Sequence, residues 1–170
     1  TDWIVDNIST LNIGYACQIG DCVENGDTYP AQWDSAWSAL GLLEDPVTTG
    51  LPEGLPYGVT VGNHDQTPNG DPAGTTTGYN QFLGADHFAG RAYYGGHYGA
   101  NNDDHYELWS ASGLDFITIS LEYDTSPDAP VLAWAESLLV AYPQRWGIVC
   151  SHNIIGASNP GSFSTAGQTI

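Results

Sequence analysis

Short apolar runs recur along the chain between longer patterned segments. Four of them have the length and the β-branched or aromatic content of strands: 15–21 (YACQIGD), 57–61 (YGVTV), 115–121 (DFITISL) and 146–150 (WGIVC). In 115–121, isoleucine and leucine alternate with threonine and serine, which is the period of a half-buried strand. The pattern therefore predicts four strands spread over most of the chain.

A helical period precedes the last of these strands. Its apolar stripe consists of Val131, Trp134, Ala135, Leu138, Leu139 and Tyr142. Asp128 is the predicted N-cap, and Pro130 falls in the first turn. A helix between two strands predicts a right-handed crossover in a parallel or mixed sheet. With a shorter helix expected before residue 15, the prediction is a single α/β (α+β layered) domain over residues 1–170.

The segment 66–104 has eight glycines, interleaved with aromatic residues, and no strong period. We expect a long rim or lid over a functional site. Within it, 101–104 (NNDD) offers side-chain oxygens for calcium, or is a solvated turn. The tail from Asn159 predicts the start of another helix, capped by Ser164 or Thr165.

Charge narrows the possible partners. The 170 residues carry a formal net charge of −18, and the only cationic side chains besides histidine are Arg91 and Arg145. No basic patch can form, which argues against nucleic acid and anionic membranes as partners. A small anionic substrate would need a bound cation to attract it. Such an acidic chain suits an extracellular or periplasmic setting.

The chain has three cysteines and no methionine, even at position 1. Cys17 and Cys150 lie in apolar runs and are expected to be small buried hydrophobic residues. Cys22 adjoins a polar turn and is the cysteine of interest. The missing methionine leads us to expect a processed product or a fragment.

Polar clusters end three of the predicted strands: Gly20-Asp21, 62–65 (GNHD) and Ser151-His152. Sites in open α/β sheets form outside the carboxyl ends of the strands, so these clusters are expected to converge. A carboxylate, an amide oxygen and an imidazole suit Zn, Mn or Fe. Alternatively, Asp21 and Asn63 are turn residues that follow a strand and have no role in metal binding.

These motifs resemble the calcineurin-like metallophosphoesterases, the superfamily that contains the purple acid phosphatases. The matching residues are GD at 20–21, GNHD at 62–65 and the late His152. The resemblance implies two mixed β-sheets packed as a sandwich and flanked by helices. It also implies two divalent or trivalent metal ions (Fe, Zn or Mn) and hydrolysis of a phosphate mono- or diester by a metal-bound hydroxide.

Carried over by position, the resemblance assigns a role to each matching residue. Asp21 would bridge the two ions, and Asn63 and His152 would be ligands of the second ion. His64 would protonate the leaving alkoxide or stabilise phosphoryl charge. Asp65 would orient the His64 ring by accepting its other N–H.

The sequence also departs from the family pattern. No D-x-H precedes Asp21 and no GHxH follows His152, so the domain is expected to be incomplete at both ends, or a degenerate relative. Arg91 and His97 are candidate substrate-binding residues in the glycine-rich segment, with surface roles as the alternative.

A second hypothesis is a non-catalytic structural or assembly protein, built on a degenerate phosphoesterase scaffold outside the cell. The incomplete ligand set and the aromatic, glycine-rich segment support it. A third is an acidic calcium-binding surface protein.

Overall fold

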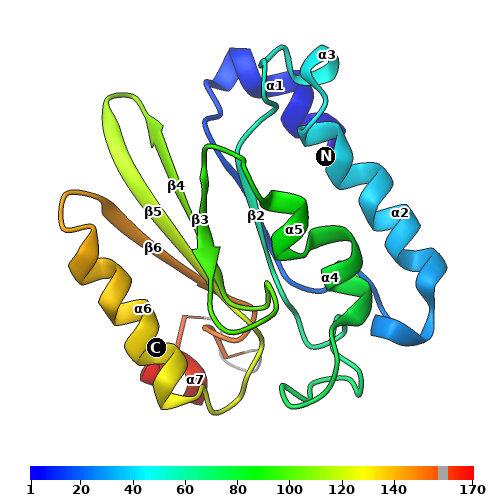
Figure 1. Cartoon of the computed structure of the whole chain (residues 1–170), viewed down its shortest axis with the longest axis vertical. Helices are drawn as coiled ribbons and strands as arrows, with labels where there is room; N and C mark the ends of the chain where they lie inside the picture. Colours follow the sequence, from blue (N-terminus) through cyan, green and yellow to red (C-terminus); the bar gives the residue numbers. More distant parts are fainter. Residues whose placement is uncertain (157–160) are drawn as a thin grey trace.

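The computed structural model describes residues 1–156 and 161–170 and contains two β-sheets with helices around them (Figure 1). The smaller sheet pairs β1 with β2 in parallel, and the larger has the order β3-β4-β5-β6. In the larger sheet β5 and β6 are parallel, and the other pairs are antiparallel. The strands are β1 (Ala16–Ile19), β2 (Tyr57–Thr60), β3 (Tyr94–His97), β4 (His105–Ala111), β5 (Leu114–Leu121) and β6 (Trp146–Ser151). The mixed α/β class is confirmed, although only the larger sheet is mixed.

Helices lie on both sides of this pair of sheets (Figure 1). α6 flanks the larger sheet, whereas α2, α4 and α5 lie on the side of β2. The α-helices are α1 (Asp2–Leu11), α2 (Pro30–Leu40), α3 (Pro46–Thr49), α4 (Thr77–Leu83), α5 (Ala85–Phe88), α6 (Ala129–Ala141) and α7 (Thr165–Thr169). Two 3₁₀ turns complete them, η1 (Gly26–Thr28) and η2 (Gly41–Leu43).

All four predicted strands are confirmed within one or two residues, and helices form at all three predicted places. Ser164 caps α7 as expected, by accepting the N–H of Gly167. Asn159, where the predicted tail begins, lies outside the described residues. Leu139 does not belong to the buried stripe of α6, because it is 41% exposed.

The expectation of a long rim over 66–104 is wrong. This segment folds into α4, α5 and β3, and its aromatic residues Tyr79, Phe88 and Tyr93 are buried in the core. The aromatic side chains that interrupt the glycines therefore build structure instead of lining a lid.

Two apolar cores are separated by a polar layer. One core packs β2 against the helices around it, with Trp33, Val59 and Phe88 fully buried. The other packs Ile117 and Ile119 of β5 against α6. Between the sheets lies what we call the inter-sheet polar layer, whose side chains are almost fully buried: Thr60, His105, Glu107, Thr118 and Ser120.

Among the described residues, no helix is long and apolar enough to cross a membrane.

Candidate metal centre

Two glycines allow the ends of β1 and β2 to meet. A Cβ atom on Gly62 would lie 2.2 Å from the backbone nitrogen of Asp21, and one on Gly20 would lie 2.7 Å from Cα of Gly62. Gly20 also has a φ of +83°, a left-handed conformation that L side chains rarely adopt. Asp21 and the GNHD segment are adjacent because no side chain separates the two backbones.

The structure brings Asp21 and His152 together, as the sequence predicts. Oδ2 of Asp21 lies 3.0 Å from Nε2 of His152, and both side chains are about a third exposed or less. The other ring nitrogen of His152, Nδ1, is hydrogen-bonded to the backbone carbonyl of Ile19. A carbonyl only accepts, so Nδ1 carries a proton, and Nε2 faces the carboxylate either with its lone pair or, in the doubly protonated ring, with an N–H donor.

Two acceptors facing each other at this distance repel unless something positive lies between them or the ring is doubly protonated. A backbone carbonyl that fixes the far nitrogen is also the usual support of a metal-ligating histidine. Two ligand atoms that each lie about 2.1 Å from the same ion are about 3.0–3.4 Å from each other. The 3.0 Å between Asp21 Oδ2 and His152 Nε2 fits two ligands of one cation.

The rest of a metal site is not assembled here. Among residues 1–156 and 161–170, no group of three or more His, Cys, Asp or Glu side chains could hold a metal ion. Asn63 follows Gly62 directly, but its amide nitrogen donates to Oδ1 of Asn69 at 3.1 Å. The described residues thus fit two ligands of one ion, with Asn63 in the adjoining loop and hydrogen-bonded to Asn69, and do not build a second ion's site.

His64 is held by Glu24 and not, as expected, by Asp65. Nδ1 of His64 donates to the backbone carbonyl of Glu24 at 3.0 Å and lies 3.4 Å from Oε1 of the same residue. This carbonyl hydrogen bond is the main cause that raises the pKa of His64 above its ordinary value. Because Nδ1 is occupied, Nε2 is the ring atom left to act on a substrate. No sequence signal marked Glu24, which becomes a neighbour of His64 only through the fold.

Asp65 instead ties the two strand ends together. It is fully buried and accepts the N–H of Gly62 at 2.8 Å and that of Val23 at 3.1 Å. Burial raises the pKa of Asp65 to about 6, against the opposing effect of these hydrogen bonds. In the reverse direction, Oδ1 of Asp21 accepts the N–H of His64 at 3.0 Å. These bonds hold the loop after β1 to the loop after β2.

The two candidate substrate-binding residues lie elsewhere. Arg91 forms an ion pair with Glu44, which also accepts a hydrogen bond from the hydroxyl of Tyr57. Tyr57 is the first residue of β2, so this ion pair lies at the opposite end of the strand from Asn63. His97 is at the end of β3, where its Nδ1 contacts the hydroxyl of Tyr94 at 2.9 Å. The structure places neither residue in contact with Asp21, His64 or His152, so the predicted substrate roles of Arg91 and His97 are not supported.

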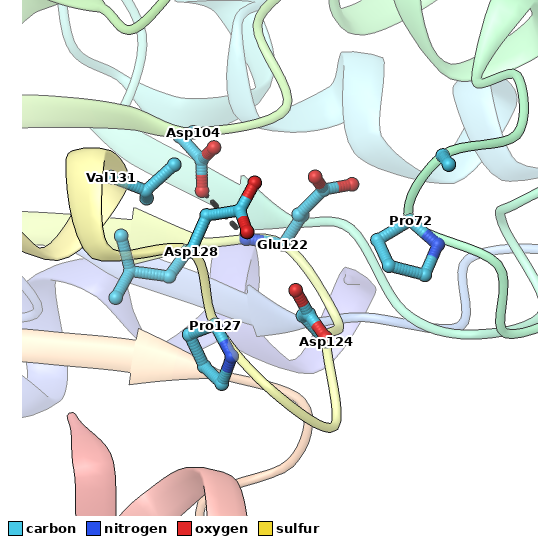
Figure 2. Close-up of a pocket in the computed structure, with 9 residues that line it drawn as sticks. Pro72, Asp104, Glu122, Asp124, Pro127, Asp128 and Val131 are labelled. Carbon is cyan, nitrogen blue, oxygen red and sulfur yellow. Dashed lines mark hydrogen bonds between the residues drawn. The ribbon is translucent and has the colours of Figure 1, made fainter.

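An acidic pocket of about 240 Å³ lies beyond the carboxyl end of β5. Figure 2 shows the carboxylates of Asp104, Glu122, Asp124 and Asp128 gathered around it, with Pro72 and Pro127 in its wall. Burial, followed by the charge of Asp104, raises the pKa of Glu122 to about 8. Burial likewise raises the pKa of Asp104 to about 6.

The 101–104 run does not form a calcium loop. Asn102 is fully buried and donates its side-chain N–H to the carbonyl of Leu83, while Asp103 accepts from Thr76 and Asp104 from the backbone of Glu122. The hydrogen bonds of these side chains therefore connect the start of β4 to neighbouring segments.

Comparison with known proteins gives little further guidance. No family model matches the chain, and no solved structure matches it. Over all 170 residues the chain is 32% identical to a protein from Bacillus subtilis (strain 168) described as "Uncharacterized protein YvnB". The chain spans 12% of the length of that relative.

Proposed function

We propose that this chain contributes to the metal centre of a phosphoesterase that hydrolyses phosphate mono- or diesters. The observation that carries the proposal is the pair formed by Asp21 and His152, a carboxylate and an imidazole whose Oδ2 and Nε2 lie 3.0 Å apart at the ends of strands from different sheets. The order of the GD and GNHD motifs before His152, and the resemblance to calcineurin-like metallophosphoesterases, supports the same function.

Each residue has a role in this proposal. Asp21, Asn63 and His152 would hold one ion. Fe, Zn or Mn, when bound there, would supply activation of water and neutralisation of phosphoryl charge. His64 delivers a proton from Nε2 to the leaving oxygen, because Nδ1 is bound by Glu24.

The surroundings of Asp21 leave room for a substrate. An open hollow of about 680 Å³ beside it is lined by Glu24 and by Tyr29, Gln32 and Ser35 of the α2 segment. No arginine lines it, so attraction of a phosphate depends on the bound cation.

The finer fold assignment belongs to the same proposal. We infer that the sheets are the two halves of a metallophosphoesterase-like sandwich, an inference supported by the contacts that join β1 to β4 and β6. An extracellular or periplasmic location is proposed from the acidic composition.

Metal binding and hydrolysis test the function separately. The purified chain is titrated with Zn²⁺ and Mn²⁺ by calorimetry, and hydrolysis of p-nitrophenyl phosphate and of its bis-ester is followed. We expect Asp21→Asn and His152→Ala to weaken metal binding by about 100-fold or more, since these changes remove ligands themselves. His64→Ala should lower turnover and leave metal affinity within a few-fold of wild type.

Asp34→Asn is the matched control, because Asp34 is an exposed carboxylate on α2 that does not line the hollow beside Asp21. Turnover that survives Asp21→Asn unchanged would refute the enzyme. A chain that binds no metal and hydrolyses neither ester would favour the alternative, a non-catalytic structural or assembly protein on the same scaffold. The lack of a complete ligand cluster in the described residues is the observation that favours this alternative.

A further inference from the structure

Two cysteines meet between the sheets. Sγ of Cys17 on β1 lies 3.6 Å from Sγ of Cys150 on β6, although 133 positions separate them in sequence. No sequence pattern pairs these two cysteines, and Cys17 is exposed instead of buried as expected. We propose that Cys17 and Cys150 are a modification site, at which oxidation forms a disulfide that joins the two sheets.

Neighbouring contacts hold both thiols in register. Two residues before Cys17, the ring of Tyr15 stacks on Trp109 of β4 with centroids 4.7 Å apart, and its hydroxyl donates to Glu107 at 2.9 Å. Two residues after Cys17, the carbonyl of Ile19 accepts from His152. β1 is therefore fixed against the larger sheet on both sides of Cys17, so the thiols face each other persistently.

The two sulfur atoms are slightly farther apart than a disulfide bond requires. A disulfide needs its sulfurs about 2.05 Å apart, so the two sulfurs must approach by about 1.5 Å, which side-chain rotation with a slight strand shift can supply. Residue 58, which pairs with Cys17 in the smaller sheet, is glycine and offers no side chain to obstruct that rotation.

An oxidant can reach the pair from one side. Cys150 is buried, whereas Cys17 lies on β1, which has a single neighbour in its sheet, and is exposed. Cys17 is therefore the thiol that meets a small disulfide such as oxidised glutathione. It attacks one glutathione sulfur and expels the other half as a thiol, and Cys150 then displaces the second glutathione.

The exchange balances without another reagent. The S–S bond of oxidised glutathione breaks, one S–S bond forms between Cys17 and Cys150, and both cysteine protons end on two glutathione thiols. The cross-link would sit four residues before Asp21 and two before His152, and so would fasten the two strand ends of the candidate metal centre.

The experiment counts thiols on the metal-free protein, so its outcome does not depend on the proposed function. The chain is incubated with oxidised or reduced glutathione in EDTA, denatured, alkylated and weighed by mass spectrometry. Of the three cysteines, we expect one free thiol after oxidation, with the loss of two hydrogen atoms, and three after reduction. A peptide map should show the Cys17 and Cys150 peptides linked.

Single variants separate this pair from the third thiol. Cys22→Ser is the matched control and should still lose two thiols, whereas Cys17→Ser and Cys150→Ser should keep both remaining thiols. In wild type and Cys22→Ser, oxidation should raise Tm by on the order of 10 °C, because the bond closes a loop of more than a hundred residues. Three free thiols after oxidation, a link that includes Cys22, a covalent dimer, or glutathione adducts alone would overturn the proposal.

Discussion

The protonation of Glu107 determines the hydrogen bonding within the inter-sheet polar layer. Nδ1 of buried His105 donates to the carbonyl of Asn102 at 2.8 Å, so its Nε2 is an acceptor. Nε2 lies 3.2 Å from Oε1 of Glu107, and neither atom has another hydrogen-bond partner among the described residues. A protonated Glu107 would donate from Oε1 to Nε2 and satisfy both atoms, while its Oε2 accepts from Tyr15.

The electrostatics agree with this protonation state. Burial raises the pKa of Glu107 to about 8, and burial lowers the pKa of His105 to about 4. Both groups are therefore expected to be neutral in the folded protein at mildly acidic pH.

We predict that Glu107→Gln makes the protein less sensitive to alkaline pH. The folded pKa of Glu107 lies above its ordinary value of 4.5, so its contribution to stability is complete below pH 4.5 and is lost as pH rises toward about 8. The change in pKa corresponds to about 5 kcal/mol of unfolding free energy as an upper bound. Glutamine has the size of the protonated acid and can make the same two hydrogen bonds, but does not ionise.

Urea unfolding between pH 5 and pH 9 measures this effect. The unfolding free energy of wild type minus that of Glu107→Gln should fall from pH 5 by up to about 4 kcal/mol, become negative well below pH 8, and level off above about pH 8. Glu136→Gln, at an exposed position of α6, should show no such trend. A difference for Glu107→Gln that stays constant within about 1 kcal/mol would refute the protonated pair.

Two further substitutions test the strand ends and the arginine. Gly62→Ala should destabilise the fold by about 2 kcal/mol or more, since the new Cβ would lie 2.3 Å from Oδ1 of Asp21. Gly50→Ala, with a φ of +69° but open space around it, should cost only about 1 kcal/mol, and equal losses in thermal unfolding would show that the close approach is not real. Arg91→Ala should cost about 1–3 kcal/mol, because it leaves the half-buried carboxylate of Glu44 unpaired by arginine. It should leave KM for the phosphoester unchanged, and a several-fold rise in KM would restore Arg91 as a substrate-binding residue.

The strand at 115–121 and the helix at 131–142 were predictable because each carries its own period, and the other strands because of their short β-branched or aromatic runs. Apolar side chains in β5 alternate, and those of α6 recur at helical spacing, so local order was visible without knowledge of the neighbours. The segment 66–104 has no such period. Its structure depends on Tyr79, Phe88 and Tyr93 entering a core made by distant segments.

The sequence by itself determined that Asp21, the GNHD motif and His152 follow strands, and that the chain carries a formal net charge of −18 with only two arginines and no lysine. Only the tertiary structure decided how these residues pair. Glu24 binds His64 while Asp65 ties two backbones, and Cys17 faces Cys150 across the sheets. The physical reason is that a strand's side-chain period is local, whereas a hydrogen bond or a thiol pair depends on which distant backbone comes within about 3–4 Å.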